Sequence, residues 1–246
     1  MNPLETYLFE RDEQVRENMK NKDLEVATHH FFEHLVKTNY VKNFRWMGVP
    51  ILQLPSDLMV LQEIIYKVRP DVIIETGVAF GGMLMFYATC LEAIGDGGRV
   101  IGIDIDIKEH TTLAINRSPL RNRIELHQMN SVDFKPFTSE RWRNMKVLVS
   151  LDSSHTHAHV LAELKLYSPL ISVGSYLVVF DTTIEAYGHF DPERNRRPWG
   201  PGNNPATAVQ KFMEGNEEFI VYREIEARAL LTAAPGGYLR RVKGAK

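Results

Sequence analysis

The sequence predicts an α/β fold with a mostly parallel sheet and helices on both of its faces. Short apolar runs alternate with longer stretches of helical periodicity between residues 72 and 214. A glycine-rich turn separates the first run from the helical stretch behind it, and acidic residues close several runs. Such alternation is typical of βαβ units, whose strands pair in parallel because each helix returns the chain to the start of the sheet.

The N-terminal part of the chain is charged and prone to form helices. Its apolar side chains recur at helical spacing, among them Val15, Met19, Phe31, Phe32, Leu35 and Val36. We expect residues 1–48 to form a helical extension that covers one side of the core or meets a partner subunit, which would allow a homo-oligomer. Residues 49–246 are expected to form the main domain.

Apolar periodicity places the elements of that domain in order. A helix over 56–69 comes first, capped by Ser56 and ended by Pro70. The expected strands lie near 72–75, 99–104, 123–127, 146–151 and 175–180. The expected helices between and after them lie near 82–94, 110–116, 156–167 and 205–214.

The C-terminal part has a different pattern. Residues 219–222 and 237–242 are strand-like, and a Pro-Gly-Gly turn over 235–237 precedes the second run. We expect an antiparallel C-terminal hairpin that completes a seven-stranded sheet. A Pro/Gly-rich loop over 183–206 is long for a connection without structure, and such loops are usually functional lids or disordered segments.

The most informative segment is residues 71–106. Its first apolar run ends at Glu75 and Gly77, Gly81 stands just ahead of the helical stretch, and the second run closes at Asp104. Gly77 and Gly81 permit tight turns and the close approach of a ligand. An acid at the end of the second strand can accept hydrogen bonds from ribose hydroxyls. The segment therefore predicts a nucleoside-binding βαβ unit.

The glycine spacing distinguishes between nucleoside cofactors. A dinucleotide fingerprint reads G-x-G-x-x-G and directs backbone amides at a pyrophosphate. This chain reads E-x-G-x-x-x-G-G, with Glu75 before the first glycine. A carboxylate there would repel a pyrophosphate but could accept from the ammonium of a cofactor that carries an amino acid. The spacing favours S-adenosylmethionine (SAM) and a class I methyltransferase over an NAD enzyme or a non-catalytic α/β domain.

Composition narrows the class of protein. A chain of 246 residues with 44% hydrophobic content can build one well-buried domain, and a net charge of −2 gives no basic footprint for nucleic acid. The single cysteine, Cys90, excludes a disulfide framework and is expected as a buried core thiol rather than a nucleophile. Neither a membrane span nor a signal peptide is indicated, so we expect a cytoplasmic protein with no membrane partner.

Two further acids stand at expected strand ends. Asp152 and Asp181 should face the same cleft as Gly77 and Asp104, because ligands sit outside the carboxyl ends of strands in a doubly wound sheet. Two carboxylates form a hard oxygen site suited to Mg²⁺, which could orient a substrate hydroxyl and lower its pKa. His155 is placed to take the proton as a general base.

Each of these assignments has a structural alternative. Asp152 could simply cap the helix that begins near Thr156, and His155 could serve structural hydrogen bonding. A zinc hydrolase site is disfavoured because the chain has no H-E-x-x-H pattern and no cysteine partner. The other histidines are expected at exposed, solvated or capping positions: His157 and His159 after Asp152, and His29, His30 and His34 in the extension.

Four segments carry a family resemblance: IETGVAFGGM, IGIDIDI, LDSSHTHAHVLAELKLYSPLISVGSYLVVFDT and RPWGPGNNPATAV. With them, most of residues 45–215 resembles the cephalosporin hydroxylase/rhamnosyl O-methyltransferase family. The resemblance implies a SAM-dependent methyltransferase with a Rossmann-like sheet. Known members of that family act in the biosynthesis of antibiotics and modified sugars.

The resemblance also implies roles for single residues. Glu75, Gly77 and Asp104 would hold the cofactor, with Asn130 and Ser131 near its adenine. Asp152 and Asp181 match metal-ligand positions, His155 matches a catalytic histidine, and residues 199–204 match a segment near the substrate mouth. The chain departs from the pattern at Phe180, where the family commonly has Glu. That loss should weaken the metal site or pass a ligand role to Thr182, Glu185 or water.

The function expected from the sequence is SAM-dependent methyl transfer to a hydroxyl of a sugar, either nucleotide-linked or part of a glycoside. The loop 185–204 would close over the site, and its Arg194, Arg196 and Arg197 could meet a phosphate. One alternative is a tailoring methyltransferase for a β-lactam or polyketide. Another is a non-catalytic partner protein that retains the fold, which Phe180 favours.

Overall fold

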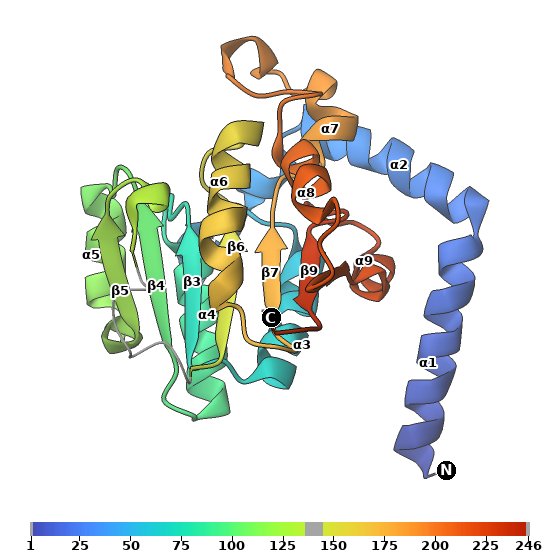
Figure 1. The fold of residues 1–246 in the computed structure, drawn as a ribbon, viewed down its shortest axis with the longest axis horizontal. Helices are drawn as coiled ribbons and strands as arrows, with labels where there is room; N and C mark the ends of the chain where they lie inside the picture. The colour runs from blue at the N-terminus through green and yellow to red at the C-terminus, as the bar shows by residue number, and fades with distance from the viewer. Residues whose placement is uncertain (1, 136–144, 245–246) are drawn as a thin grey trace.

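The chain builds a mostly parallel sheet, seen in a computed structural model that describes residues 2–135 and 145–244. The seven described strands of this sheet have the order β5-β4-β3-β6-β7-β9-β8. They are β3 (Val72–Thr76), β4 (Arg99–Asp104), β5 (Ile124–Gln128), β6 (Val147–Leu151), β7 (Tyr176–Val179), β8 (Phe219–Val221) and β9 (Tyr238–Arg241). The first five strands in this order, β5, β4, β3, β6 and β7, pair in parallel. Strand β9 pairs antiparallel with both β7 and β8 (Figure 1). The predicted Rossmann-like fold class is confirmed.

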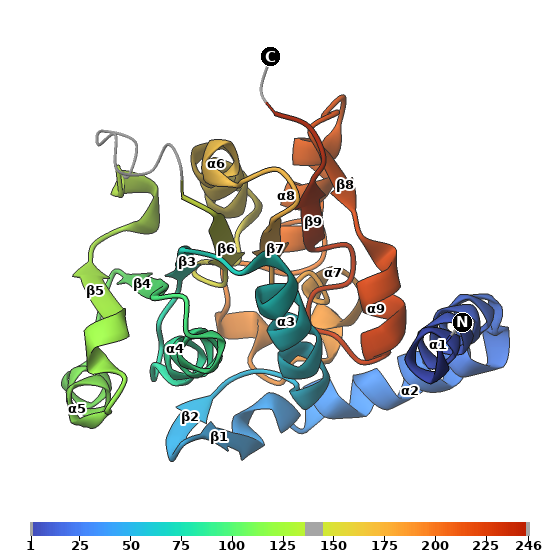
Figure 2. The same ribbon diagram turned by 90° about the horizontal axis from the view of Figure 1, so that it is seen from below.

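Helices cover both faces of this sheet (Figure 2). On one face lie α3 (Pro55–Val68), α4 (Gly82–Ile94) and α5 (Glu109–Arg117), and on the other lie α6 (His157–Tyr167) and α8 (Pro205–Met213). Each face has its own apolar cluster, with Leu61 and Leu84 in one and Leu164 and Val209 in the other. Burial on both faces explains why the parallel strands are almost continuously apolar in sequence.

The N-terminal segment consists of two helices and a small hairpin. Helix α1 (Pro3–Lys20) buries none of its side chains and stands away from the sheet, whereas α2 (Lys22–Lys37) buries Phe32 and Leu35 against the domain (Figure 2). Strand β1 (Phe44–Trp46) then pairs with β2 (Val49–Ile51), so residue 48 lies in their turn. None of the helices in the described residues has the length and apolarity needed to cross a membrane.

Two expected local features are wrong. Ser56 does not cap α3: the helix begins at Pro55, which favours the first helical position, and the Ser56 hydroxyl donates to the carbonyl of Leu231. The C-terminal strands are antiparallel as predicted but do not form a simple hairpin, because α9 (Arg223–Ala229) lies between β8 and β9. The sequence of α9, REIEARA, consists mainly of good helix formers.

The long connection after β7 contains structure of its own. It forms α7 (Ile184–Tyr187) and two 3-10 turns, η7 (Gly188–Phe190) and η8 (Arg194–Arg196), before α8 begins. The remaining 3-10 turns described are η1 (Tyr40–Asn43), η2 (Arg121–Arg123), η3 (Ser131–Asp133) and η6 (Ser168–Leu170). The long loop expected over 183–206 therefore contains short helices, which lie beyond the end of β7 (Figure 1).

Candidate active site

A cavity of about 630 Å³ opens at the carboxyl ends of the parallel strands. Eight of the nine residues predicted from the sequence line it: Glu75, Gly77, Asp104, Asn130, Ser131, Asp152, His155 and Asp181. Gly81 does not line it. That residue caps α4 at φ +87°, and a side chain there would meet Thr111 and Ile115. The location matches the crevice where doubly wound sheets bind ligands.

Gly77 allows β3 and β6 to end close together. Its φ is +87°, and a Cβ on it would lie 2.1 Å from the carbonyl oxygen of Asp152. The two strand ends are joined there, because the Asp152 amide donates to the Thr76 carbonyl at 2.9 Å. A side chain at Gly77 would both strain the backbone and force these strand ends apart.

Asp104 orders the turn that follows Gly77. Its carboxylate accepts from the amides of Val78 at 2.8 Å and Ala79 at 3.2 Å, and also from the amide of Asp106 at 3.0 Å. A carboxylate has about four acceptor positions. Asp104 can therefore order the turn and still accept from a ligand in the cavity.

Glu75 is a buried acid without a cationic neighbour in the described structure. It is 1% exposed, and its Oε2 has no hydrogen-bond partner among residues 2–135 and 145–244. Burial raises the pKa of Glu75 well above its ordinary value, and the nearby charge of Asp104 raises it further. A buried carboxylate with an unused acceptor atom, beside a cavity, fits a cationic group of a ligand such as an ammonium.

Asp152, His155 and Asp181 meet in one cluster. Ligand atoms of the three side chains all lie within 4.8 Å of one another, and His155 Nε2 is 3.2 Å from Asp181 Oδ2. Burial raises the pKa of Asp152 well above its ordinary value, and the charges of Asp181 and Glu75 add to this. Asp181 has φ +55°, an uncommon conformation for a residue other than glycine. Two carboxylates and an imidazole form a donor set that suits a divalent cation.

Phe180 contributes nothing to this cluster. Its side chain is 1% exposed and packs in the apolar cluster with Tyr176 and Tyr238, on the face of the sheet that α3 covers. It lines neither the 630 Å³ cavity nor the neighbouring one. The oxygen ligands of the candidate metal site are therefore the carboxylates of Asp152 and Asp181.

The connection after β7 also reaches His155. The rings of Trp199 and His155 meet edge to face, with centroids 4.7 Å apart and planes at 88°. The Arg197 guanidinium lies 5.3 Å from the Trp199 ring centroid, and its Nε is 3.1 Å from Asp191 Oδ2. The Trp199 ring can therefore fix the orientation of the His155 imidazole.

A second cavity of about 180 Å³ adjoins the first. The two share six lining residues: Asn39, Val41, His155, Asp181, Arg197 and Ala233. The rest of the second cavity is lined from α2, the segment before α3 and the connection after β7. Most of these side chains are apolar, but Asp191 and Arg194 are among them. The position of the second cavity places His155 and Asp181 between a cofactor-sized space and a smaller, more apolar one.

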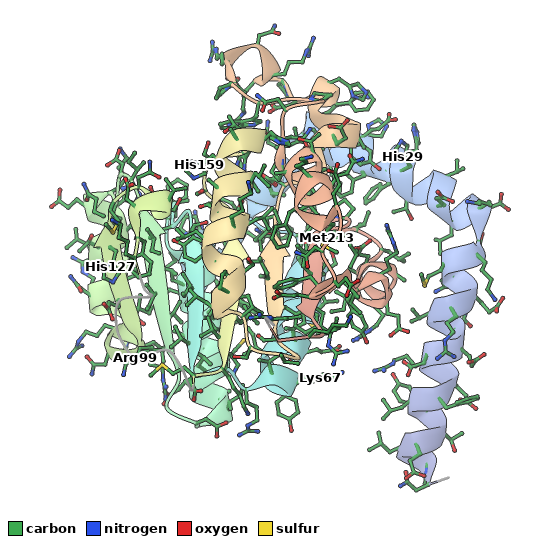
Figure 3. All side chains as sticks on the ribbon, in the orientation of Figure 1. His29, Lys67, Arg99, His127, His159 and Met213 are labelled. Atoms are coloured by element: carbon green, nitrogen blue, oxygen red, sulfur yellow. The ribbon has the colours of Figure 1, made fainter. Side chains whose placement is uncertain are left out.

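Sequence reasoning missed His159 and Gln53. His159, labelled on α6 in Figure 3, lines the cavity: its Nε2 lies 3.0 Å from Ser131 Oγ and 3.1 Å from Ser153 Oγ. The buried Glu163 accepts from Ser153 at 2.7 Å and lies 3.4 Å from the same His159 nitrogen. The sequence held one signal for this contact: His159 and Glu163 are four residues apart in an expected helix, which places their side chains next to each other.

Gln53 and two other histidines also make contacts that the sequence did not indicate. Gln53 donates to Asp152 at 3.1 Å, and nothing in its local pattern marks it. His157 Nδ1 lies 2.8 Å from Thr207 Oγ1, which links α6 to α8. His29 is not simply solvated, because its Nδ1 lies 2.5 Å from the hydroxyl oxygen of Tyr187.

Comparisons with known proteins agree with the fold. A model of the family described as "Rhamnosyl O-methyltransferase/CmcI" matches residues 38–242. The rhamnosyl O-methyltransferase of Mycobacterium leprae (strain TN) is 32% identical over 210 residues, covering 82% of this chain and 86% of that protein. The rhamnosyl O-methyltransferase of Mycobacterium tuberculosis (strain H37Rv) is 29% identical over 214 residues, covering 82% of each chain.

Solved structures of CmcI have the same fold. Its apo structure aligns with a TM-score of 0.59 at 22% identity and covers 82% of this chain and 78% of that one. A CmcI structure with Mg and SAM aligns with a TM-score of 0.57 at the same identity and the same coverage. The resemblance stated from the sequence is confirmed: the chain belongs to the rhamnosyl O-methyltransferase/CmcI family.

Proposed function

We propose that this O-methyltransferase transfers a methyl group from SAM to a hydroxyl of a sugar, with His155 as the general base. The observation that carries the proposal is the position of His155. It stands beside two carboxylates where the cofactor-sized cavity meets the smaller one. The names of the relatives, which are rhamnosyl O-methyltransferases, support a sugar as the acceptor.

The larger cavity has the groups that SAM requires. We assign Glu75 to its ammonium, the Gly77 turn and Asp104 to its amino-acid and ribose parts, and Asn130 and Ser131 to its adenine side. The unused Oε2 of Glu75 is the feature that fits a cationic amino-acid moiety. When bound, SAM supplies a methyl group activated by a sulfonium.

His155 would take the proton of the acceptor hydroxyl. Imidazole is suited to general-base catalysis at neutral pH. The carboxylate of Asp181 lies 3.2 Å from Nε2, and the Trp199 ring packs against the imidazole, so its orientation is fixed. Methyl transfer proceeds in line, and positioning of the two reactants can therefore supply most of the rate enhancement.

We also propose that Asp152 and Asp181 hold a divalent metal, with Mg²⁺ suited to their oxygen atoms. A metal there would orient the acceptor hydroxyl and lower its pKa. The cluster supports this assignment, and so does the magnesium in a CmcI structure. Because Phe180 supplies no oxygen, Gln53 becomes important: its bond to Asp152 fixes one of the two carboxylates.

Calorimetric titration with S-adenosylhomocysteine (SAH), with and without Mg²⁺, tests the proposal first. We expect binding in the micromolar range, and no binding in either condition would remove the methyltransferase assignment from this site. His155→Gln should lower turnover by roughly 100-fold or more while leaving SAH affinity nearly unchanged. Equal loss of turnover and SAH affinity would contradict the general-base role.

Three broader proposals accompany this function. We propose the division into an extension over 1–48 and a methyltransferase domain over 49–246, which is supported by α1, a helix that buries none of its side chains. A homo-oligomer through the extension is supported by the exposed Tyr7 and Phe9 of α1. A cytoplasmic location is supported by the unpaired Cys90, which needs no oxidising compartment.

A further inference from the structure

We propose that His159 acts as a positioning residue for the cofactor, by holding the Ser131 hydroxyl as a hydrogen-bond donor to one ring nitrogen of the adenine. His159 lies on α6 and lines the larger cavity together with Ser131 (Figure 3). This inference rests on the proposed function, which assigns Asn130 and Ser131 to the adenine side of the cofactor. A donor at this point would distinguish a base with an acceptor nitrogen there from a base without one.

The backbone of Ser131 is fixed by groups behind the cavity. Ser131 begins the short turn η3 and is 4% exposed, and its carbonyl accepts from the hydroxyl of the buried Tyr167 at 2.7 Å. The preceding Asn130 caps the turn, because its side chain accepts from the amide of Val132 at 3.3 Å. A serine hydroxyl can still rotate when its backbone is fixed. The direction of the Ser131 hydroxyl hydrogen therefore has to be set by another group.

A chain of hydrogen bonds behind Ser131 sets that direction. Ser153 donates its hydroxyl hydrogen to Oε1 of Glu163 at 2.7 Å. A hydroxyl has one hydrogen to donate, so Ser153 Oγ can only accept from His159 Nε2, which lies 3.1 Å away. The network therefore assigns a hydrogen to Nε2. The Glu163 oxygen, 3.4 Å from the same nitrogen, favours this tautomer as well.

An Nε2 atom that carries a hydrogen cannot accept from Ser131. His159 Nε2 and Ser131 Oγ lie 3.0 Å apart, so Ser131 Oγ accepts from His159. One N–H can be shared between two acceptors, here the oxygens of Ser131 and Ser153. The hydroxyl hydrogen of Ser131 is then left to point into the cavity that both Ser131 and His159 line.

A hydroxyl donor matches an acceptor atom of the base. The adenine ring offers acceptor nitrogens, whereas its exocyclic amino group offers donors. If Ser131 instead donated to His159, the Ser131 oxygen would face the cavity as an acceptor and would suit the amino group. Ser153 and Glu163 therefore decide, through His159, which kind of atom of the base is bound.

The burial of Glu163 supports a functional role for this chain. Glu163 is 0% exposed, and its Oε2 has no hydrogen-bond partner among residues 2–135 and 145–244. A buried carboxyl oxygen without a partner destabilises the folded protein. An apolar side chain would avoid this cost, as Val160 and Leu164 do at the neighbouring buried positions of α6. Retention of an acid here is expected if its contacts serve the ligand.

Calorimetric titration of the full-length protein with SAH and its 1-deaza, 3-deaza and 7-deaza analogues tests the inference. Each analogue replaces one acceptor nitrogen of the adenine by a C–H group. We expect Ser131→Ala to weaken SAH binding roughly fivefold, the effect of one hydrogen bond. One analogue should bind the wild type more weakly than SAH does and should lose no further affinity in Ser131→Ala. That analogue identifies the nitrogen that Ser131 meets.

Substitutions of His159 test its positioning role. His159→Leu should weaken SAH binding roughly fivefold and should abolish the discrimination against the same analogue, because the Ser131 hydroxyl loses its fixed direction. His159→Gln keeps an amide N–H near the position of Nε2 and should restore that discrimination. Rescue of this kind is not expected if His159 only fills space. His159→Phe, which keeps a ring, covers the case in which His159→Leu does not fold.

His157→Leu is the matched control. His157 has the same side chain on the same helix, but it lines neither cavity, and its Nδ1 lies 2.8 Å from Thr207 Oγ1 instead. The substitution should leave both SAH affinity and the discrimination between SAH and its analogues unchanged.

Two results would overturn the inference while the wild type binds SAH. One is a Ser131→Ala variant that still discriminates against all three analogues as the wild type does. The other is a His159→Leu variant that weakens SAH and every analogue equally. Absence of SAH binding to the wild type is a different outcome, because it would remove the proposed function and this inference with it.

Discussion

Single acidic residues give the active site its electrostatic character. Glu75 and Asp152 are both buried, and burial is the main reason that the pKa of each is raised. The sequence predicted both residues because each stands at the end of an apolar strand. Gln53, which donates to Asp152, was missed because a contact between residues 99 positions apart leaves no local pattern. His159 was missed although its spacing to Glu163, at i and i+4, is visible in the sequence.

Replacing Glu75 by Gln should separate binding from stability. An ionised carboxylate in a buried site destabilises the folded protein at neutral pH, so a neutral isostere should raise the Tm of the unliganded enzyme. The same change removes a charged acceptor and should weaken SAH binding roughly tenfold or more. Thermal unfolding and calorimetry at pH 7 check both effects. Unchanged SAH affinity would show that Glu75 does not meet the ammonium.

At the level of elements, the turn after β3 depends on a glycine that no other residue can replace. Gly77→Ala should cost at least ~2 kcal/mol of stability and abolish measurable SAH binding, because its Cβ would meet the Asp152 carbonyl. Gly95→Ala is the control: its φ is +80°, but its Cβ would meet nothing within 4 Å. It should cost only ~1 kcal/mol and keep SAH affinity, as denaturation and calorimetry would show. Similar effects of both substitutions would contradict the steric argument.

The elements themselves were predictable where their pattern was long. The five parallel strands and the helices between them could be predicted from apolar periodicity, because a sheet that is buried on both faces requires apolar side chains along its strands. Helix α9 was missed because seven residues are too few for a clear period between two strand-like runs. The short helices after β7 were missed for a similar reason, since α7 spans only Ile184–Tyr187.

Across the whole molecule, a buried acid ties the first helix of the main domain to its last strand. Asp57 of α3 accepts from the Tyr238 hydroxyl at 2.7 Å, the Thr232 hydroxyl at 2.5 Å and the Ala233 amide at 2.8 Å. Burial is the main reason that the pKa of Asp57 is raised from 3.8 to about 6. No local pattern in the sequence revealed this link, which joins positions 175 to 181 residues apart.

The stability of the unliganded protein should therefore depend on pH through Asp57. Because the pKa of Asp57 is higher in the folded protein than in the unfolded chain, protonation of Asp57 stabilises the fold. This stabilisation is fully present below about pH 3.8 and is lost as the pH rises through about 6. Relative to Asp57→Asn, the wild type should gain at most ~3 kcal/mol as pH falls from 7 to 4. Urea denaturation of both proteins over that pH range measures the difference between their free energies of unfolding. The contributions of the other carboxyl groups are the same in both proteins and cancel in this difference. Parallel curves would show that Asp57 does not titrate in this window.

Helix α2 also has a consequence for how such enzymes diversify. The cluster of Asp152, His155 and Asp181 follows two strands of the shared fold, whereas one wall of the smaller cavity lies on a helix that precedes the matched family region. Recombination that exchanges only the codons of α2 would leave the cluster unchanged and replace one side of the smaller cavity. We therefore expect the shape of that cavity to vary among related enzymes independently of the cluster.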